Sequence, residues 1–346
     1  MKVKAIPYDL DFIAPVGTSR GILESKRSWI LYTELDRGLA VGECGIFAGL
    51  SSEDLPAYES VLDRSIKEFH QGTLDLKSLR AWPSILCGWE MLLSDIESKG
   101  SHELCSNSFN KGLAIPINGL IWMGSRKEML EQIDLKLSQD FPCVKLKIGG
   151  IDFAEELDLL TYIRSHFTSN EIEIRLDANG AFEPNEAIHK LNKLAPYEIH
   201  SIEQPIRQGQ WDAMAHLCAN SPIPIALDEE LIGLHDQNSK KKMISHISPQ
   251  YIIVKPSLVG GFSGSDEWVE IAESSDIQWW ATSALESNIG LNAIAQWTST
   301  KSNPLPQGLG TGSLYSNNFP SPLKVESGTL TYDSSATWDF SSLKNV

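Results

Sequence analysis

Short apolar runs alternate with amphipathic stretches from about residue 114 onward, and this alternation constrains the fold more than any other feature. Helical patterns fill the intervals at residues 125–139, 152–167 and 262–275. The apolar runs occupy residues 113–117, 143–148, 172–176, 199–202, 223–227, 251–254 and 277–280, with a weak run near Gly308. Such alternation predicts a parallel sheet, and eight strands over about 200 residues favour a closed (β/α) barrel. An open doubly wound sheet is the alternative, but no G-x-G-x-x-G motif follows the first run.

The preceding part of the chain, up to about residue 110, has the pattern of an α+β unit. Residues 2–14, 27–35 and 39–43 are strand-like, and the turn at 36–38 predicts a hairpin between the second and third of these strands. The polar segment 51–54 predicts the start of a helix, with acidic residues in its first turn. Residues 84–98 carry apolar side chains at helical spacing and predict a further helix.

Charge and cysteine usage exclude several classes of protein. The 346 residues carry 29 Lys and Arg against 45 Asp and Glu, a formal net charge of −16, so the chain lacks the basic surface of a nucleic-acid-binding protein. We expect no secretory signal from the residues at its start, and no apolar stretch approaches the roughly 18 residues of a membrane span. The five cysteines include no C-x-x-C pair. We therefore expect reduced thiols, a cytoplasmic location, and neither nucleic-acid nor membrane partners.

Charged residues stand at the ends of five successive apolar runs. In chain order they are Lys147, Asp177, Glu203, Asp228 and Lys255, separated by 30, 26, 25 and 27 residues. Each step is about one βα unit, so a barrel brings all five to its carboxyl-terminal face, where barrel enzymes carry out their chemistry. A single strand-end carboxylate is more often a helix cap, and a single lysine is more often solvated. The five together point to function, because buried charges are costly unless they are paired or bound to metal.

The pattern of charges favours a metal-assisted proton transfer. Three converging carboxylates need a cation to stay ionised together, and hard oxygen ligands with open positions suit Mg²⁺. Lys145 and Lys147 point to the same face of a strand, with Lys147 closer to the strand end. A lysine beside a divalent cation and a second lysine is expected to have a lowered pKa and to serve as a base.

These strand-end segments resemble those of the enolase superfamily, in its muconate-lactonizing-like subgroup. The resemblance is carried by VKLKIG at 144–149, RLDANGAF at 175–182, IEQP at 202–205, LDEE at 227–230, VKPSLVGG at 254–261 and TSALESNIGL at 282–291, and by GECG at 42–45 and the Pro83-Ser84 pair upstream. It implies an α/β fold, a modified TIM barrel with an N-terminal α+β capping domain. The implied limits are 1–110 for the capping domain, 111–320 for the barrel, and 321–346 for a C-terminal segment that returns to the capping domain.

The resemblance also implies roles for individual residues. Asp177, Glu203 and Asp228 are the expected ligands of Mg²⁺, for which Mn²⁺ can substitute. Lys147 is the expected acid/base with Lys145 beside it, and Lys255 is expected to stabilise an enediolate from the opposite face. Arg175, Asn179 and Glu229 are expected around the metal or substrate, although a structural ion pair is an equally open role for Arg175.

Two further segments are expected at the rim of the barrel. Backbone N–H groups of Thr282, Ser283 and Ala284, and of the run 308–313, are candidates for binding a substrate carboxylate, although an ordinary glycine-rich loop explains 308–313 equally well. The resemblance implies that residues 15–21 form a mobile loop that closes over the site.

The closest resemblance within the superfamily is to enzymes of menaquinone biosynthesis. It implies a small carboxylate substrate, 2-succinyl-6-hydroxy-2,4-cyclohexadiene-1-carboxylate, dehydrated to o-succinylbenzoate. A racemase of N-succinylamino acids or a dipeptide epimerase would use the same two lysines, but the segment GLGTGSLY at 308–315 lacks the acidic pair of dipeptide epimerases. A cycloisomerase, a sugar-phosphate barrel and an inactive binding barrel are weaker alternatives. The choice between a monomer and a homo-oligomer stays open.

Overall fold

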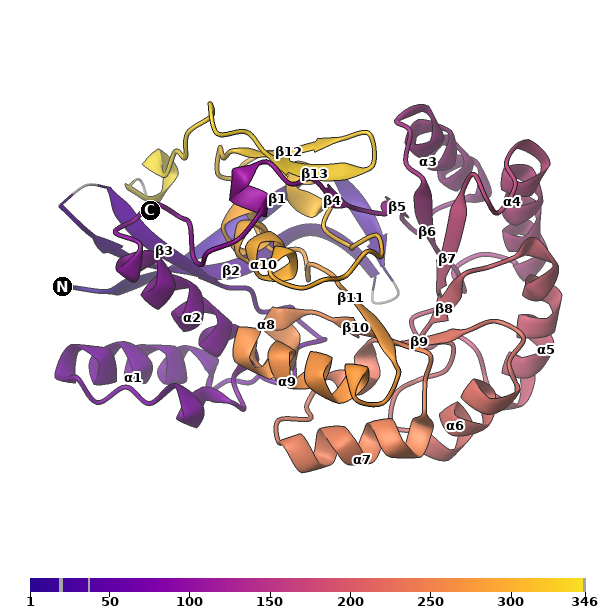
Figure 1. The fold of residues 1–346 in the computed structure, drawn as a ribbon, viewed down its shortest axis with the longest axis horizontal. Helices are drawn as coiled ribbons and strands as arrows, with labels where there is room; N and C mark the ends of the chain where they lie inside the picture. The colour runs from indigo at the N-terminus through magenta and orange to yellow at the C-terminus, as the bar shows by residue number, and fades with distance from the viewer. Residues whose placement is uncertain (19–20, 37, 345–346) are drawn as a thin grey trace.

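The N-terminal part of the protein is built on a three-stranded antiparallel sheet (Figure 1). In this computed structural model, which describes residues 1–18, 21–36 and 38–344, the strands are β1 (Lys4–Thr18), β2 (Gly21–Glu34) and β3 (Leu39–Cys44). β2 and β3 form the hairpin that the sequence predicts. Of the expected loop at 15–21, residues up to Thr18 belong to β1 and Gly21 begins β2, whereas Ser19 and Arg20 lie outside the described residues.

Two helices cover one face of this sheet and complete a unit that we call the cap. They are α1 (Tyr58–Gln71) and α2 (Pro83–Glu97), with the short helix η1 (Leu76–Leu79) between them. α2 matches the helix predicted at 84–98, and its apolar side chains Ile85, Trp89 and Leu92 are fully buried in the cap core. The expected helix start at 51–54 is wrong, because α1 begins only at Tyr58. Glu53 instead accepts a hydrogen bond from the backbone N–H of Ser84, in the first turn of α2, at 2.6 Å.

A parallel sheet of seven strands forms the second part of the described chain (Figure 1). Its strands are β5 (Gly119–Ile121), β6 (Cys143–Lys147), β7 (Glu173–Asp177), β8 (Ser201–Glu203), β9 (Ile225–Leu227), β10 (Tyr251–Val254) and β11 (Gln278–Ala281). The helices are α3 (Arg126–Ser138), α4 (Phe153–His166), α5 (Pro184–Leu194), α6 (Trp211–Asn220), α7 (Gln237–Ile247), α8 (Pro256–Val259), α9 (Gly261–Glu273) and α10 (Asn288–Ser299). Consecutive strands pair side by side from β5 to β11, as a barrel requires.

The first and last barrel strands differ from the prediction. The run at 113–117 was expected as the first strand, but β4 (Ile115–Pro116) pairs with a C-terminal strand, and β5 opens the barrel sheet. The weak run near Gly308 makes isolated bridges rather than a full strand. Gln307 and Gly308 still join the two edges of the sheet, because the Asn118 N–H donates to Gln307 at 3.0 Å and the Gly308 N–H donates to Ala281 at 2.8 Å.

The C-terminal part of the chain packs against both of the preceding parts. β12 (Leu323–Glu326), β13 (Thr329–Tyr332) and β4 form a three-stranded sheet. Tyr8 in the cap donates a hydrogen bond to the carbonyl of Asn317 at 2.8 Å, and its ring lies 4.7 Å from that of Phe319. The division into domains at residues 110 and 320 stays a prediction. Over the described ranges, no helix combines the length and apolar character needed to cross a bilayer.

Candidate active site

The predicted charged residues meet at the carboxyl ends of the barrel strands. Lys147 is paired in register with Asp177 across β6 and β7, and Asp177 with Glu203 across β7 and β8. Asp228 and Lys255 directly follow β9 and β10. Parallel pairing thus brings residues that are 25 to 30 positions apart in the chain to one edge of the sheet. We call this set, together with Lys145, the charged cluster.

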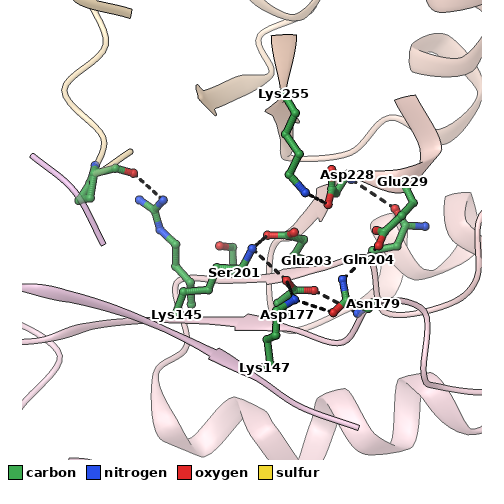
Figure 2. Close-up of polar contacts among 12 residues, drawn as sticks. Lys145, Lys147, Asp177, Asn179, Ser201, Glu203, Gln204, Asp228, Glu229 and Lys255 are labelled. Atoms are coloured by element: carbon green, nitrogen blue, oxygen red, sulfur yellow. Dashed lines mark hydrogen bonds and ion pairs between the residues drawn. The ribbon is translucent and has the colours of Figure 1, made fainter. Parts of the chain in front are cut away.

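Within the charged cluster, each lysine contacts at least one carboxylate (Figure 2). Lys145 Nζ lies 2.9 Å from Asp177 Oδ2 and also forms an ion pair with Glu203. Lys147 Nζ lies 3.0 Å from the same oxygen of Asp177. Lys255 forms an ion pair with Asp228 and reaches the carboxylates from the side opposite Lys147, as Figure 2 shows. The two lysines therefore flank the carboxylates, as a reaction on two faces of a substrate requires.

Burial and neighbouring charges shift the pKa values of the charged cluster in opposite directions. Burial works to raise the pKa of Asp177, but Lys145 and Lys147 outweigh it and lower this pKa well below its usual range. Burial raises the pKa of Glu203 well above normal, and the charges of Asp177 and Asp228 add to this effect. Burial would lower the pKa of Lys145, yet Asp177 and Glu203 raise it. The pKa of Lys255 is also raised, against burial, by Asp228 and Glu203.

These directions describe the protein groups alone and do not test the lowered lysine pKa that the sequence leads us to expect beside a divalent cation. Among the protein groups alone, the surrounding carboxylates dominate the environment of Lys145 and Lys255. The lowered pKa was expected beside a divalent cation, whose charge would oppose that of the carboxylates.

The donor set fits a divalent cation, although its members are not gathered into a formed metal site. No three His, Cys, Asp or Glu side chains in the described part of the chain have the arrangement of a metal centre, because lysines lie between the carboxylates. Glu203 is 2% exposed, and its Oε1 is buried without a hydrogen-bond partner. Such an oxygen is costly to bury unless a cation or a donor satisfies it. Three carboxylates at adjacent strand ends are also the hard oxygen ligands that Mg²⁺ prefers.

Asn179 links Lys147 to a fourth carboxylate. Its Oδ1 accepts a hydrogen bond from Lys147 Nζ at 2.7 Å, and its Nδ2 donates to Glu229 Oε1 at 3.0 Å. Burial raises the pKa of Glu229, and the charges of Asp228 and Asp177 raise it further. Asn179 and Glu229 thus lie against the charged cluster, where the sequence places them.

Gln204 is a functional candidate to which the sequence analysis gave no role. It is fully buried, and its Oε1 accepts hydrogen bonds from the backbone N–H groups of Asp228 and Glu230 at 3.3 and 3.4 Å. Its φ of 41° is in the left-handed region, which a non-glycine residue rarely adopts. Gln204 therefore ties the end of β8 to the loop that presents Asp228. The sequence feature that could have indicated a role for Gln204 is its position in the IEQP motif, directly after Glu203.

Arg175 lies apart from the metal-ligand candidates. Its Nε donates to Glu173 Oε1 at 2.7 Å, and its Nη1 donates to the carbonyl of Pro306 at 2.8 Å. Its guanidinium lies 4.2 Å from the centre of the Trp280 ring. These contacts favour the structural ion pair, one of the two roles left open by the sequence.

The backbone N–H groups of Thr282 and Ser283 cannot bind substrate as expected, because each already has a partner. The Thr282 N–H donates to Val254 at 2.9 Å, and the Ser283 N–H donates to Gly308 at 3.0 Å. Both bonds help to close the sheet around β11. The side chain of Thr282 remains a candidate, since its hydroxyl oxygen is buried without a hydrogen-bond partner and the residue lines the cavity described next.

A cavity of about 290 Å³ adjoins the charged cluster, and we call it the catalytic cavity. Its polar wall contains Lys145, Lys147, Asp177, Asn179, Asp228, Glu229, Lys255 and Thr282. Its apolar wall includes Phe47 and Leu50 from the cap and Trp122 and Leu285 from the barrel. A wider groove of about 1460 Å³ shares Trp122, Asn179 and Leu314 with it and forms its mouth beside the β1–β2 hairpin. Such an apolar cavity with a few convergent polar groups is typical of a small-molecule site.

The chain is similar to known proteins over most of its length. Residues 128–335 match the family described as Enolase C-terminal domain-like. The o-succinylbenzoate synthase of Desulfotalea psychrophila is 45% identical over 355 aligned residues, covering 93% of this chain and 96% of that protein. The crystal structure of MenC from Desulfotalea psychrophila superimposes with a TM-score of 0.81 at 41% identity, covering 96% of this chain and 99% of the other.

A more distant relative has the same fold. The L-Ala-D/L-Glu epimerase of Bacillus subtilis is 26% identical over 183 residues, 52% of this chain and 49% of the epimerase. Its substrate-liganded structure superimposes with a TM-score of 0.81 at 19% identity, covering 96% of each chain. The chain therefore belongs to the enolase superfamily and, within it, to the family of the o-succinylbenzoate synthases.

Proposed function

We propose that the protein dehydrates 2-succinyl-6-hydroxy-2,4-cyclohexadiene-1-carboxylate to o-succinylbenzoate, a step of menaquinone biosynthesis. The observation that carries this proposal is the likeness to an o-succinylbenzoate synthase across 93% of the chain. The charged cluster supports it, because its three lysines and the carboxylates of Asp177 and Asp228 line a cavity of small-molecule size.

Asp177, Glu203 and Asp228 are the residues that would hold the divalent metal ion used by enzymes of this superfamily, and we propose Mg²⁺. The ion would supply positive charge beside the substrate carboxylate and so make the adjacent C–H bond more acidic. The buried Oε1 of Glu203 and the hard carboxylate set support this assignment. Asn179 and Glu229 would orient the surrounding groups through their hydrogen bond.

Lys147 is the proposed acid and base. In its neutral form, Nζ takes the proton from the ring carbon that bears the carboxylate, and the electrons of that C–H bond form an enediolate. The enediolate then expels the hydroxyl group from the neighbouring ring carbon, and Lys147 returns the proton so that water leaves. The ring becomes aromatic, which drives the reaction forward. Lys255 holds positive charge over the opposite face of the enediolate and lowers the energy of that state.

The composition of the cavity wall disfavours a dipeptide epimerase. A dipeptide carries an ammonium group that needs a counter-charge once it is buried. Among the described residues that line the catalytic cavity, the carboxylates are Asp177, Asp228 and Glu229, all in or against the charged cluster. The rim residues Gly308, Gly310 and Thr311 offer no acid. An N-succinylamino acid has no ammonium group, so its racemisation is the rival activity that an assay must separate.

A direct assay tests the proposal. Purified protein with Mg²⁺ is given the cyclohexadiene substrate, and the aromatic product is followed by ultraviolet absorbance and mass spectrometry. We expect metal-dependent formation of o-succinylbenzoate with loss of one water. Absence of product from a folded, metal-loaded protein would contradict the proposed function.

A further inference from the structure

Glu286 is a buried carboxylate that the proposed reaction does not use. It follows β11 and precedes α10, and it is fully buried. Its Oε2 accepts a hydrogen bond from the hydroxyl of Ser283 at 2.6 Å, and its Oε1 accepts one from the hydroxyl of Ser257. A buried carboxylate of this kind is retained only where its hydrogen bonds offset the cost of burial.

Ser257 connects Glu286 to Lys255 by a short and rigid path. Ser257 is in the first turn of α8, which begins immediately after Lys255. The turn is closed by a hydrogen bond of 2.8 Å from the Leu258 N–H to the Lys255 carbonyl. A hydrogen bond on the Ser257 side chain therefore restrains the backbone that carries Lys255, two residues away.

Ser283 connects Glu286 to the rim of the catalytic cavity. The Ser283 hydroxyl accepts hydrogen bonds from the Glu286 N–H at 3.2 Å and from the Thr311 hydroxyl at 3.0 Å. Its own hydrogen is thereby left for the bond to Glu286 Oε2. Both Ser283 and Thr311 line the catalytic cavity. Glu286 thus joins the segments that follow β10 and β11 to the rim loop that contains Thr311.

Close packing leaves Glu286 little freedom to move. A Cβ atom added to Gly290 would lie 2.6 Å from the Glu286 Cβ, and one added to Gly45 would lie 3.0 Å from its Cγ. Gly45 belongs to the cap and Gly290 to α10, so the carboxylate is held between the cap and the barrel. A side chain held from both sides can transmit a fixed position to its hydrogen-bond partners.

Glu43 offers a matched comparison within the same region. It is also fully buried and accepts hydrogen bonds from serine hydroxyls, at 2.7 Å from Ser28 and at 2.5 Å from Ser287. It also accepts one from the Gly290 N–H at 3.1 Å. These bonds fasten the cap to the start of α10 without contacting Ser257 or Ser283. Glu43 and Glu286 are therefore both buried carboxylates bonded to serine hydroxyls, but only Glu286 contacts Ser257 and Ser283.

We propose that Glu286 is a positioning residue for the reaction, which fixes Lys255 through Ser257 and the cavity rim through Ser283. The proposal rests on the proposed function for the catalytic role of Lys255, but the positioning of Lys255 by Glu286 can be tested separately. Loss of Glu286 is expected to release Lys255 while leaving Lys147 in place, because Lys147 is held by Asp177 and Asn179 on the other side of the cavity.

The test compares Glu286→Gln with Glu43→Gln in the full chain. A glutamine keeps the size of the side chain, but its NH₂ group cannot accept the second serine hydroxyl. The first measurement is the rate at which an acylating reagent modifies Lys255 and Lys147, read for each lysine by mass spectrometry of the folded protein. The second measurement is kcat and KM for the cyclohexadiene with Mg²⁺. Ser257→Ala is the second variant, used in place of Glu286→Gln if that protein does not fold.

The expected result for Glu286→Gln is at least threefold faster modification of Lys255, with modification of Lys147 unchanged. We also expect kcat to fall at least tenfold with KM within threefold, whereas Glu43→Gln lowers the melting temperature and alters neither lysine selectively. Unchanged modification of Lys255, or equal changes at both lysines, would overturn the positioning role. A wild-type protein without turnover would contradict the proposed function only, and the modification rates would still decide the role of Glu286.

Discussion

Lys147 donates a hydrogen bond from Nζ to Asn179 Oδ1 at 2.7 Å, so the proposed base is held by a neutral amide as well as by the carboxylate of Asp177. Asn179 is itself held by its hydrogen bond to Glu229. Because an amide adds no charge, it orients the lysine without favouring the protonated form as a carboxylate does. Two partners on one side therefore restrict the directions in which Lys147 can point into the cavity.

Removing the Asn179 side chain is expected to slow the reaction. The residue has a φ of 43°, which glycine adopts without strain, so Asn179→Gly removes the amide and keeps the backbone. We expect kcat to fall about tenfold, equivalent to about 1.4 kcal/mol, because Lys147 loses one of its two partners. Steady-state kinetics checks this, with Asn192→Gly on an exposed helix face as the control for an unrelated asparagine. A kcat within twofold of the wild type would show that Asn179 does not orient the base.

Lys147→Ala is expected to abolish removal of the substrate proton. The alanine variant keeps the metal-ligand candidates but loses the proposed base, so kcat should fall by at least three orders of magnitude, as about 4 kcal/mol of barrier implies. Lys127→Ala, on the exposed surface of α3, is the matched control and should leave kcat unchanged. Lys147→Ala activity within tenfold of wild type would refute the assigned role.

Glu203→Gln is expected to weaken metal binding and leave the fold intact. The substitution keeps the side-chain volume but replaces a buried anionic ligand with a neutral one. Calorimetric titration with Mg²⁺ should show a Kd at least tenfold higher than in the wild type. Removal of metal from the wild type with EDTA should abolish activity, and added Mg²⁺ should restore it. Equal Mg²⁺ affinity in the two proteins would remove Glu203 from the ligand set.

The strand-end charges could be predicted from sequence because their spacing follows the repeat of the fold. Lys147, Asp177 and Glu203 recur at about one βα unit, and parallel pairing brings such positions together. The first barrel strand could not be predicted in the same way. The 113–117 run is as apolar as a barrel strand, yet β4 pairs with β13, which lies more than 200 residues away in the chain.

Hydrogen-bond partners that are distant in the chain also escaped prediction. No local pattern indicates that the Thr282 and Ser283 N–H groups donate to the carbonyls of Val254 and Gly308, bonds that form as the barrel closes. The role of Glu53 could not be predicted for the same reason. The local sequence places Glu53 in the first turn of a helix, but its carboxylate accepts a hydrogen bond from the first turn of α2, 31 residues away. Local patterns report which groups need partners, whereas the tertiary fold decides which partners they find.

The buried Glu53 is expected to make stability depend on pH. Burial raises the pKa of Glu53 from 4.5 to about 8, against the opposing effect of the hydrogen bonds from Ser84. Between these two pH values the folded state binds a proton that the unfolded state has lost. The free energy of unfolding should therefore fall as pH rises from 4.5 to 8, by up to about 1.4 kcal/mol per pH unit.

Urea denaturation at pH 5.5, 6.5 and 7.5 measures this contribution. Glu53→Gln cannot titrate and should show a shallower fall in unfolding free energy over this range than the wild type. Asp54→Asn, at the exposed neighbouring position, is the control and should keep the wild-type slope. Identical slopes in the wild type and Glu53→Gln would mean that Glu53 is ionised in the folded protein.

The most direct test of the central claim is a competition between reactions in D₂O. Purified protein with Mg²⁺ is offered the cyclohexadiene, a panel of dipeptides and a panel of N-succinylamino acids, and products and deuterium content are read by mass spectrometry and NMR. We predict rapid formation of o-succinylbenzoate, with deuterium entering the dipeptides and N-succinylamino acids far more slowly. Rapid exchange at the α-carbon of an amino-acid substrate, with no o-succinylbenzoate formed, would contradict the synthase assignment.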